Sequence, residues 1–157
     1  MAINLKSLSK PEGQRPIIAT LFGEGGMGKT TLASMFPKPV FIRTEDGTAS
    51  LVGNDNVSLF PLATSSQDVL DAIEALATEK HDHKTLVIDS ITQLATQIET
   101  EIVESDSKAK SISQAGGGYG AGYGQASERH AQIREWAGSL AYEMNMNVVF
   151  IGHADTE

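Results

Sequence analysis

Residues 23–30 constrain the fold of this chain more than any other stretch. They read Gly-Glu-Gly-Gly-Met-Gly-Lys-Thr and complete the pattern G-x-x-x-x-G-K-T. Glycines permit a backbone with positive φ, whose N–H groups can closely approach phosphate oxygens. In this pattern Lys29 meets the β- and γ-phosphates, and the hydroxyl of Thr30 suits Mg²⁺. The pattern therefore predicts a phosphate-binding loop that opens a helix, whose dipole adds positive potential at its N-terminus.

The residues on either side of the loop support this prediction. Residues 16–22 are mostly apolar and predict a buried parallel strand, and residues 31–36 predict a short helix that Pro37 ends. The motif requires this order of strand, loop and helix, so a glycine-rich turn without a ligand is the disfavoured alternative. We expect a nucleotide site formed by Gly23, Glu24, Gly25, Gly26, Met27, Gly28, Lys29, Thr30 and Thr31.

Strand and helix patterns alternate along the rest of the chain. This alternation predicts an α/β fold in which a mostly parallel sheet carries helices on both faces. Residues 1–15 are polar and contain Pro and Gly, and we expect them to form an N-terminal arm before one domain at 16–157. Ser65 or Ser66 is expected to cap one of the helices. The predicted strands are 40–43, 57–62, 85–89 and 147–151, and the predicted helices are 67–80, 91–102 and 126–145.

Composition excludes several classes of protein. The sequence has no cysteine, which rules out a disulfide framework and a cysteine-ligated zinc site. No apolar run is long enough to cross a membrane and no signal segment opens the chain, so we expect a cytoplasmic protein without membrane contacts. The formal net charge of −8 disfavours broad attraction to nucleic acid, so any DNA contact requires a local patch or loop.

Two acidic positions are predicted to join the phosphate loop, because the carboxyl ends of parallel strands share one edge of a sheet. Asp89 ends the strand 85–89 and is expected to hold Mg²⁺ with Thr30; the alternative is that it only caps the next helix. Glu45 follows the strand 40–43 and is the candidate that orients the attacking water, with Asp46 as second choice. An ordinary solvated turn is the alternative for Glu45 and Asp46.

The four histidines differ in what their positions predict. His153 follows the last strand by two positions, where its side chain can hydrogen-bond a γ-phosphate, although spacing alone favours a structural or exposed histidine. His81, His83 and His130 lie on or beside predicted helix surfaces. His81 and His83 flank Asp82 and could chelate a metal weakly, but a polar turn is the favoured interpretation.

Together these segments resemble the RecA-like recombinase core, and in particular the short phage-encoded RecA-like ATPases that act with single-strand-binding protein in recombination and annealing. The resemblance spans residues 17–153. Residues 41–45 look like the strand that ends in the family's catalytic glutamate, residues 86–90 look like its Walker B strand, and residues 149–153 look like the strand that ends in its γ-phosphate sensor. The bacterial recombinase usually has glutamine at that sensor position.

The resemblance implies a RecA-like P-loop NTPase fold that binds ATP and Mg²⁺, with catalytic roles for Lys29, Glu45 and His153. In the family's strand order the His153 strand lies between the phosphate-loop strand and the Asp89 strand, which implies that His153 lies beside the γ-phosphate. The family core continues beyond this point. We therefore expect the core to be incomplete at residue 157, or to be completed by a partner such as a second copy of the chain.

A glycine-rich segment, residues 105–127, falls where the family has its first DNA-binding loop. Residues 116–124 alternate glycine with tyrosine and alanine and predict no regular element. Neighbouring acidic residues weaken the case for a basic patch, the bacterial loop does not share this pattern, and a flexible linker is the alternative. Tyrosine rings can stack on bases and lysines can contact phosphates, so the candidate contacts with single-stranded DNA are Lys108, Lys110, Tyr119 and Tyr123.

The sequence therefore predicts a Mg²⁺-dependent ATPase that acts on single-stranded DNA in phage-type recombination or replication, inside a bacterial host cell. A nucleotide-binding module that turns over slowly and recruits protein partners is the alternative. A small-molecule kinase is the third candidate, but such an enzyme normally has a basic lid, and no arginine-rich segment is present.

Overall fold

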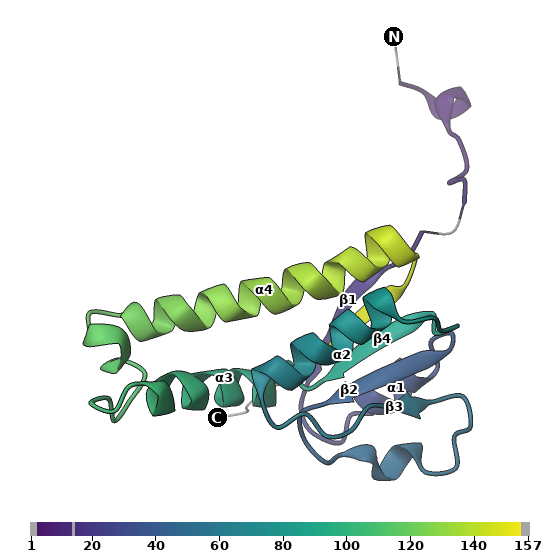
Figure 1. Ribbon diagram of the computed structural model, residues 1–157. Coiled ribbons are helices and arrows are strands. Elements are labelled where there is room, and N and C mark those ends of the chain that lie inside the picture. Colours follow the sequence, from purple (N-terminus) through teal and green to yellow (C-terminus); the bar gives the residue numbers. More distant parts are fainter. Residues whose placement is uncertain (1–2, 14, 155–157) are drawn as a thin grey trace.

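The computed structural model describes residues 3–13 and 15–154. Within these residues five strands form one sheet in the order β1-β5-β4-β2-β3, and every pairing is parallel (Figure 1). This arrangement confirms the predicted α/β fold of the RecA-like P-loop class. The strands are β1 (Ile18–Gly23), β2 (Pro39–Arg43), β3 (Ser58–Leu59), β4 (Thr85–Asp89) and β5 (Asn147–His153). The α-helices are α1 (Lys29–Ser34), α2 (Ser66–Thr78), α3 (Ile91–Ser105) and α4 (Ala121–Met144).

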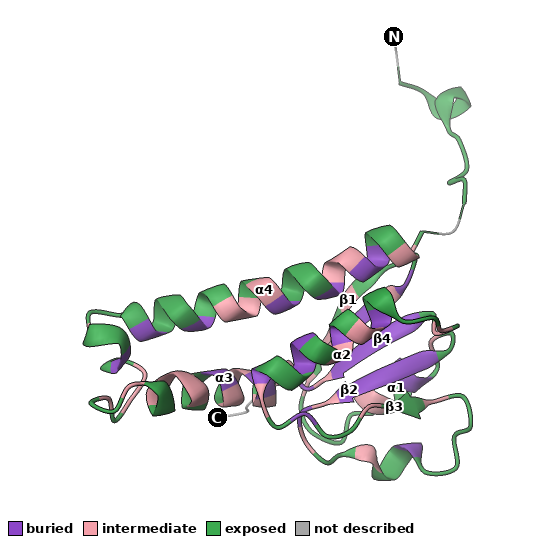
Figure 2. Ribbon diagram, in the orientation of Figure 1, coloured by how far each residue is buried: buried purple, intermediate pink, exposed green. Residues whose placement is uncertain are grey.

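The core lies on both faces of the three central strands. Side chains alternate between the faces of a strand, so Val40 and Ile42 of β2 join the cluster under α2, α3 and α4, whereas Phe41 joins the cluster under α1. The first four residues of β2 and of β4 are buried, as Figure 2 shows. A strand that is covered on both faces needs a continuous apolar run, and residues 86–88 of β4 supply one.

The strand before the phosphate loop differs from its prediction. β1 lies at the edge of the sheet, and its residues alternate between exposed and half-buried, so the expected burial of this strand is wrong. Ile18 is 47% exposed and Phe22 is 67% exposed. An apolar run indicates a strand, but it does not reveal whether the described chain covers both sides of that strand. The order in which β5 lies between β1 and β4 agrees with the expected order.

Side-chain hydrogen bonds fix the start of α2, whereas close packing accompanies the start of α4. Ser65, rather than Ser66, caps α2: its side chain accepts a hydrogen bond from the backbone of Asp68, whose carboxylate accepts one in return from the backbone of Ser65. The long helix α4 begins at Ala121, five residues before the predicted start. Its second residue, Gly122, is buried, and an added Cβ would lie 2.2 Å from the carbonyl oxygen of Ile112.

The glycine-rich segment is therefore shorter than expected. Residues 121–124 are helical, which corrects the prediction that residues 116–124 contain no regular element. Close packing against Ile112 offsets the low helix propensity of glycine at the start of α4. The irregular connection between α3 and α4 covers residues 106–120 and contains one short 3₁₀ turn, Ala115–Gly117.

Two peripheral features complete the fold. The described residues between 3 and 13 are exposed, contain a 3₁₀ turn at Leu5–Ser7, and extend away from the sheet in Figure 1. A second 3₁₀ turn, Thr48–Leu51, follows β2 and packs beside α1. In the described part of the chain, no helix combines the length and the apolar character needed to cross a membrane.

Candidate functional site

The predicted phosphate loop connects β1 to α1 at the carboxyl edge of the sheet. Gly26 and Gly28 have φ angles of +78° and +85°, a region that side chains with a Cβ rarely adopt. A Cβ at either position would meet nothing within 4 Å, so backbone conformation rather than crowding requires glycine there. Gly28 caps α1, whose first residue is Lys29. The structure thus forms the loop and the helix start that the motif predicts.

The ammonium group of Lys29 folds back over this loop. Its Nζ atom donates hydrogen bonds to the carbonyl oxygens of Gly23 at 2.7 Å and Glu24 at 2.6 Å. These partners are neutral carbonyl groups, so within the described structure the ammonium group forms hydrogen bonds but no ion pair. A phosphate in the loop would find this charge beside the backbone N–H groups at the start of α1.

Asp89 ends β4 beside the loop. Its Oδ2 atom accepts a hydrogen bond of 2.7 Å from Oγ1 of Thr30. Ser90 provides the side-chain cap of α3, so the alternative in which Asp89 caps that helix is wrong. Burial raises the pKa of Asp89; the hydrogen bond from Thr30 opposes this rise and the negative charge of Glu45 adds to it. The hydroxyl and carboxylate oxygens are hard ligands, and this donor set fits Mg²⁺.

Glu45 and His153 form a pair at the same edge. Nε2 of His153 lies 2.6 Å from Oε1 of Glu45, and both side chains are half-buried. Partial burial alone would raise the pKa of Glu45, but hydrogen bonds from His153 and Ser90 and electrostatic attraction to His153 and Lys29 together outweigh it, so the pKa lies below its usual value. Glu45, Asp89 and His153 each place one ligand atom within 4.8 Å of the other two. Asp46, the second choice, is exposed and lies outside this cluster.

Two threonines that the sequence analysis missed hold these elements together. The buried Thr44 donates a hydrogen bond of 2.8 Å to the carbonyl oxygen of Ser90 and accepts one of 2.9 Å from its N–H. The hydroxyl of Thr92, in the first turn of α3, accepts a 2.8 Å hydrogen bond from the backbone N–H of His153. Thr44, at the end of a strand, carries no sequence signal for such a role, because threonine is also an ordinary strand residue.

A pocket of about 280 Å³ lies at this edge, lined by the phosphate loop, the start of α1, the turn after β2 and His153. The turn after β2 contributes two residues that the sequence analysis did not select. Apart from His153, Lys29 is the one side chain among the described residues lining this pocket that can carry a positive charge. The lining residues are Gly26, Gly28, Lys29, Thr30, Thr31, Gly47, Ser50 and His153.

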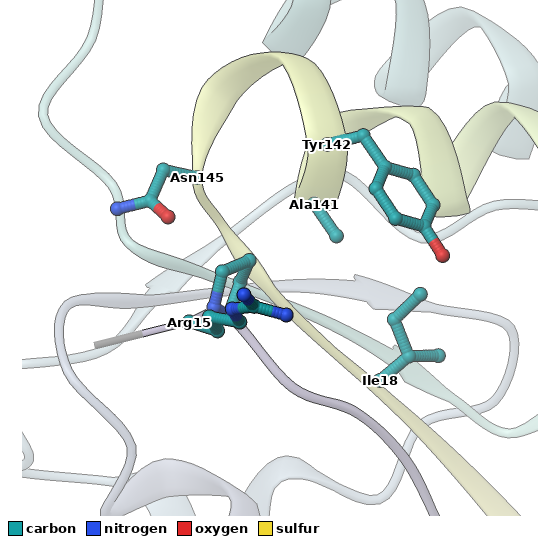
Figure 3. Close-up of a pocket in the computed structure, with 6 residues that line it drawn as sticks. Arg15, Ile18, Ala141, Tyr142 and Asn145 are labelled. Atoms are coloured by element: carbon teal, nitrogen blue, oxygen red, sulfur yellow. The ribbon is translucent and has the colours of Figure 1, made fainter. Parts of the chain in front are cut away.

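A larger pocket of about 480 Å³ lies elsewhere. Figure 3 shows Arg15, which precedes β1, and Ile18, the first residue of β1, below Ala141 and Tyr142 from the last turns of α4. The phosphate loop follows the opposite end of β1, so this pocket does not belong to the site described above.

The predicted DNA contacts lie at the α3–α4 tip, which we define as residues 106–124. Lys108, Lys110, Tyr119 and Tyr123 are all exposed there. The carboxylate of Asp106 accepts 3.0 Å hydrogen bonds from the N–H groups of Lys108 and Gly116, which gives the tip an internal structure. Figure 1 shows α3 and α4 side by side up to this tip. Because the 15 residues of α3 span about 22 Å, the tip is remote from the phosphate loop.

The other histidines lie outside the site. Nε2 of His81 lies 2.8 Å from the carbonyl oxygen of Leu76, and its Nδ1 accepts a hydrogen bond from the N–H of His83. Asp82 forms an ion pair of 2.7 Å with Lys38. These contacts agree with a polar turn. Burial lowers the pKa of His130, which lies on α4, although the negative charge of Glu99 opposes the change.

A family model described as an AAA domain matches residues 15–157. The chain belongs to this family. Membership indicates a P-loop ATPase-type domain that binds a nucleotide, usually together with Mg²⁺. No curated protein matches the sequence. The AAA domain therefore has its phosphate loop, the Thr30–Asp89 pair and the Glu45–His153 pair at one edge, while the roles of the individual side chains stay predictions.

Proposed function

We propose that this AAA domain is a Mg²⁺-dependent ATPase that acts on single-stranded DNA in phage-type recombination or replication. One observation carries the ATPase part: the ends of β2, β4 and β5 bring Glu45, Asp89 and His153 together beside the phosphate loop. Thr30 and Asp89 would hold Mg²⁺, which neutralises phosphate charge when bound. A single-strand-binding protein and further copies of this chain are the partners that such a function implies.

The proposed reaction is in-line attack of water on the γ-phosphate of ATP. The lowered pKa of Glu45 keeps its carboxylate ionised at neutral pH, so it can accept a hydrogen bond from the attacking water and orient it. Lys29 stabilises negative charge on the transferred group. A γ-phosphate beside His153 would compete with Glu45 for the imidazole, and this competition would free the Glu45 carboxylate for the water.

The tip of the helical hairpin supports the DNA part of the proposal. Tyr119 is fully exposed and Tyr123 is 52% exposed, so both rings are available for stacking, which contributes about 1–3 kcal/mol per base. Residues 106–120 contain two lysines and one aspartate, so the local charge is positive although the chain carries a net charge of −8. The hydrogen bond between His153 and Thr92 provides a contact through which the phosphate site could act on α3 and its tip.

The test measures ATP hydrolysis with and without Mg²⁺ and a single-stranded oligonucleotide, at low and moderate salt. We expect Mg²⁺-dependent hydrolysis that DNA stimulates, and loss of that stimulation in a Tyr119→Ala/Tyr123→Ala variant. Tyr142→Ala is the matched control, because Tyr142 is also exposed but lies in the last turns of the same helix α4. Equal stimulation in all these proteins would contradict DNA binding at the tip.

The test of coupling uses glycines of the tip that have room for a methyl group. Gly117 and Gly118 have positive φ angles, and a Cβ at either would meet nothing within 4 Å, so alanine changes the backbone preference without a clash. If the tip responds to the phosphate site, Gly117→Ala and Gly118→Ala should reduce DNA-stimulated hydrolysis more than basal hydrolysis. Unchanged stimulation would contradict the coupling.

A nucleotide-binding module with little turnover is the second candidate. It is favoured by the pocket itself, where the described lining residues include no arginine that could stabilise charge on the γ-phosphate. Glu45→Gln separates the two functions. An ATPase should lose about 10²–10⁴-fold in turnover and keep its ATP affinity. A recruiting module should show the same negligible turnover before and after the substitution.

A further inference from the structure

We propose that Glu45, Asp89 and His153 form a Zn²⁺-binding site in the nucleotide-free domain. The cluster offers one imidazole nitrogen and two carboxylate oxygens, all within 4.8 Å of one another. Imidazole nitrogens and carboxylate oxygens are both ligands of Zn²⁺, and three protein ligands with a water in the fourth position form an open Zn²⁺ site. This site differs from the predicted Mg²⁺ position at Thr30 and Asp89, because an imidazole nitrogen favours transition-metal ions over Mg²⁺.

The sheet holds the three ligands in place. Asp89 ends β4, and the backbone register pairs it with Arg43 of β2 on one side and Ile151 of β5 on the other. Glu45 and His153 each lie two residues beyond these partners. Asp89 and His153 therefore lie at the ends of two adjacent paired strands, and Glu45 lies two residues beyond the third, so the sheet fixes much of the ligand spacing before any ion arrives. A preorganised site of this kind loses little conformational entropy when it binds an ion.

The charges of the cluster also favour a cation. The carboxylates of Glu45 and Asp89 lie together with one imidazole in this cluster. Lys29 forms no ion pair with either carboxylate in the described structure; its Nζ atom donates to the carbonyl oxygens of Gly23 and Glu24. A divalent ion would relieve the repulsion between the two half-buried carboxylates.

The geometry requires the ligands to adjust, because atoms that now lie within 4.8 Å of one another must reach the spacing of a tetrahedral site. With Zn–N and Zn–O bonds of about 2.0–2.1 Å, two ligands of a tetrahedral site lie about 3.3 Å apart. Nε2 of His153 and Oε1 of Glu45 are now 2.6 Å apart and share a hydrogen bond. The ion would take the place of the shared proton, which is released to solvent, and the two side chains would separate by less than about 1 Å.

The other histidine cluster is a poor competitor. Both ring nitrogens of His81 make contacts, with the carbonyl oxygen of Leu76 and the N–H of His83, and Asp82 is paired with Lys38.

Zn²⁺ at the proposed site would engage Glu45 and His153 and would therefore hold the ATPase inactive. That consequence rests on the proposed function, whereas the binding itself does not.

The experiment titrates Co²⁺, a spectroscopic substitute for Zn²⁺, into the full chain without nucleotide and records visible absorption. Because the sequence has no cysteine, thiolate ligands cannot contribute to the spectrum. We expect saturation at one equivalent and displacement of Co²⁺ by Zn²⁺. Glu45→Gln and His153→Gln should each weaken binding at least about tenfold. The matched control, His81→Gln/His83→Gln, should bind Co²⁺ like the parent, and circular dichroism would check the fold of every variant.

Two outcomes would overturn the proposal. One is the absence of saturable one-to-one Co²⁺ binding. The other is binding that survives in both His153→Gln and Glu45→Gln, or that disappears in the His81/His83 control. Because the titration contains no nucleotide, its result is independent of whether the domain hydrolyses ATP, and a failure of either proposal can be recognised separately.

Discussion

The carboxyl edge of the sheet and the α3–α4 tip are held in place by different kinds of contact. At the edge, the pairing of β2, β4 and β5 positions Glu45, Asp89 and His153, which are far apart in the sequence. At the tip, short-range contacts dominate: Asp106 binds the backbone of Gly116, and several residues have positive φ. Substitutions at the edge should therefore change chemistry more than stability, whereas substitutions at the tip should do the reverse.

The largest expected effect is at the edge. Lys29→Ala should lower ATP turnover by about 10²–10³-fold, because it removes the lysine charge that faces the phosphate pocket. Thermal unfolding should change little. Lys38→Ala is the control, since Lys38 lies at the other end of the sheet and pairs with the exposed Asp82. A similar loss of turnover in both variants would show that lysine charge in general, rather than the pocket, matters.

At the tip, Gly122→Ala should lower the free energy of unfolding by about 3 kcal/mol. Its Cβ would lie 2.2 Å from the carbonyl oxygen of Ile112, so backbone must move. Gly124→Ala, two residues further along α4, meets nothing within 4 Å and should stabilise the protein by up to about 1 kcal/mol. Urea unfolding measures both. Equal effects would mean that α4 does not pack at Gly122 as described.

Substitution of Thr44 is expected to change both the free energy of unfolding and ATP turnover, which makes it an exception among the residues of the edge. Thr44→Val should cost about 2 kcal/mol of stability, because the buried N–H and carbonyl groups of Ser90 lose their partner. It should also lower kcat more than it changes KM for ATP, since Thr44 precedes Glu45. Thr44→Ser keeps the hydroxyl and should recover both properties. Identical behaviour of the valine and serine variants in unfolding and steady-state assays would contradict this role.

The smallest expected effect depends on pH. Burial raises the pKa of Asp89, so the folded protein holds this proton more tightly than the unfolded chain. Ionised Asp89 therefore opposes folding above the raised pKa, and the penalty disappears as the pH falls below the usual aspartate value. Asp89→Asn, which can still accept from Thr30, should slightly stabilise the nucleotide-free protein at neutral pH. Unfolding midpoints between about pH 3 and pH 8 should show this gain fading in acid; a constant difference would contradict it.

Local patterns explain which parts of the fold could be predicted. The position of the phosphate loop could be predicted from its glycines and lysine, and that of Asp89 from its place at the end of a buried apolar strand. The start of α4 could not be predicted, because the low helix propensity of glycine is offset by the contact between Gly122 and Ile112. The exposure of β1 could not be predicted either, since an apolar run looks the same in an edge strand and in a central one.

By itself, the sequence determined the order of strand, phosphate loop and helix in residues 16–36, and it placed Glu45, Asp89 and His153 at or just beyond the ends of strands. These features depend on residues that are neighbours along the chain. Only the tertiary structure decided that Glu45 and His153, 108 positions apart, share a hydrogen bond, and that Thr44 joins β2 to Ser90. Such contacts depend on how separate strands pair, and the local preferences of each strand do not determine that pairing.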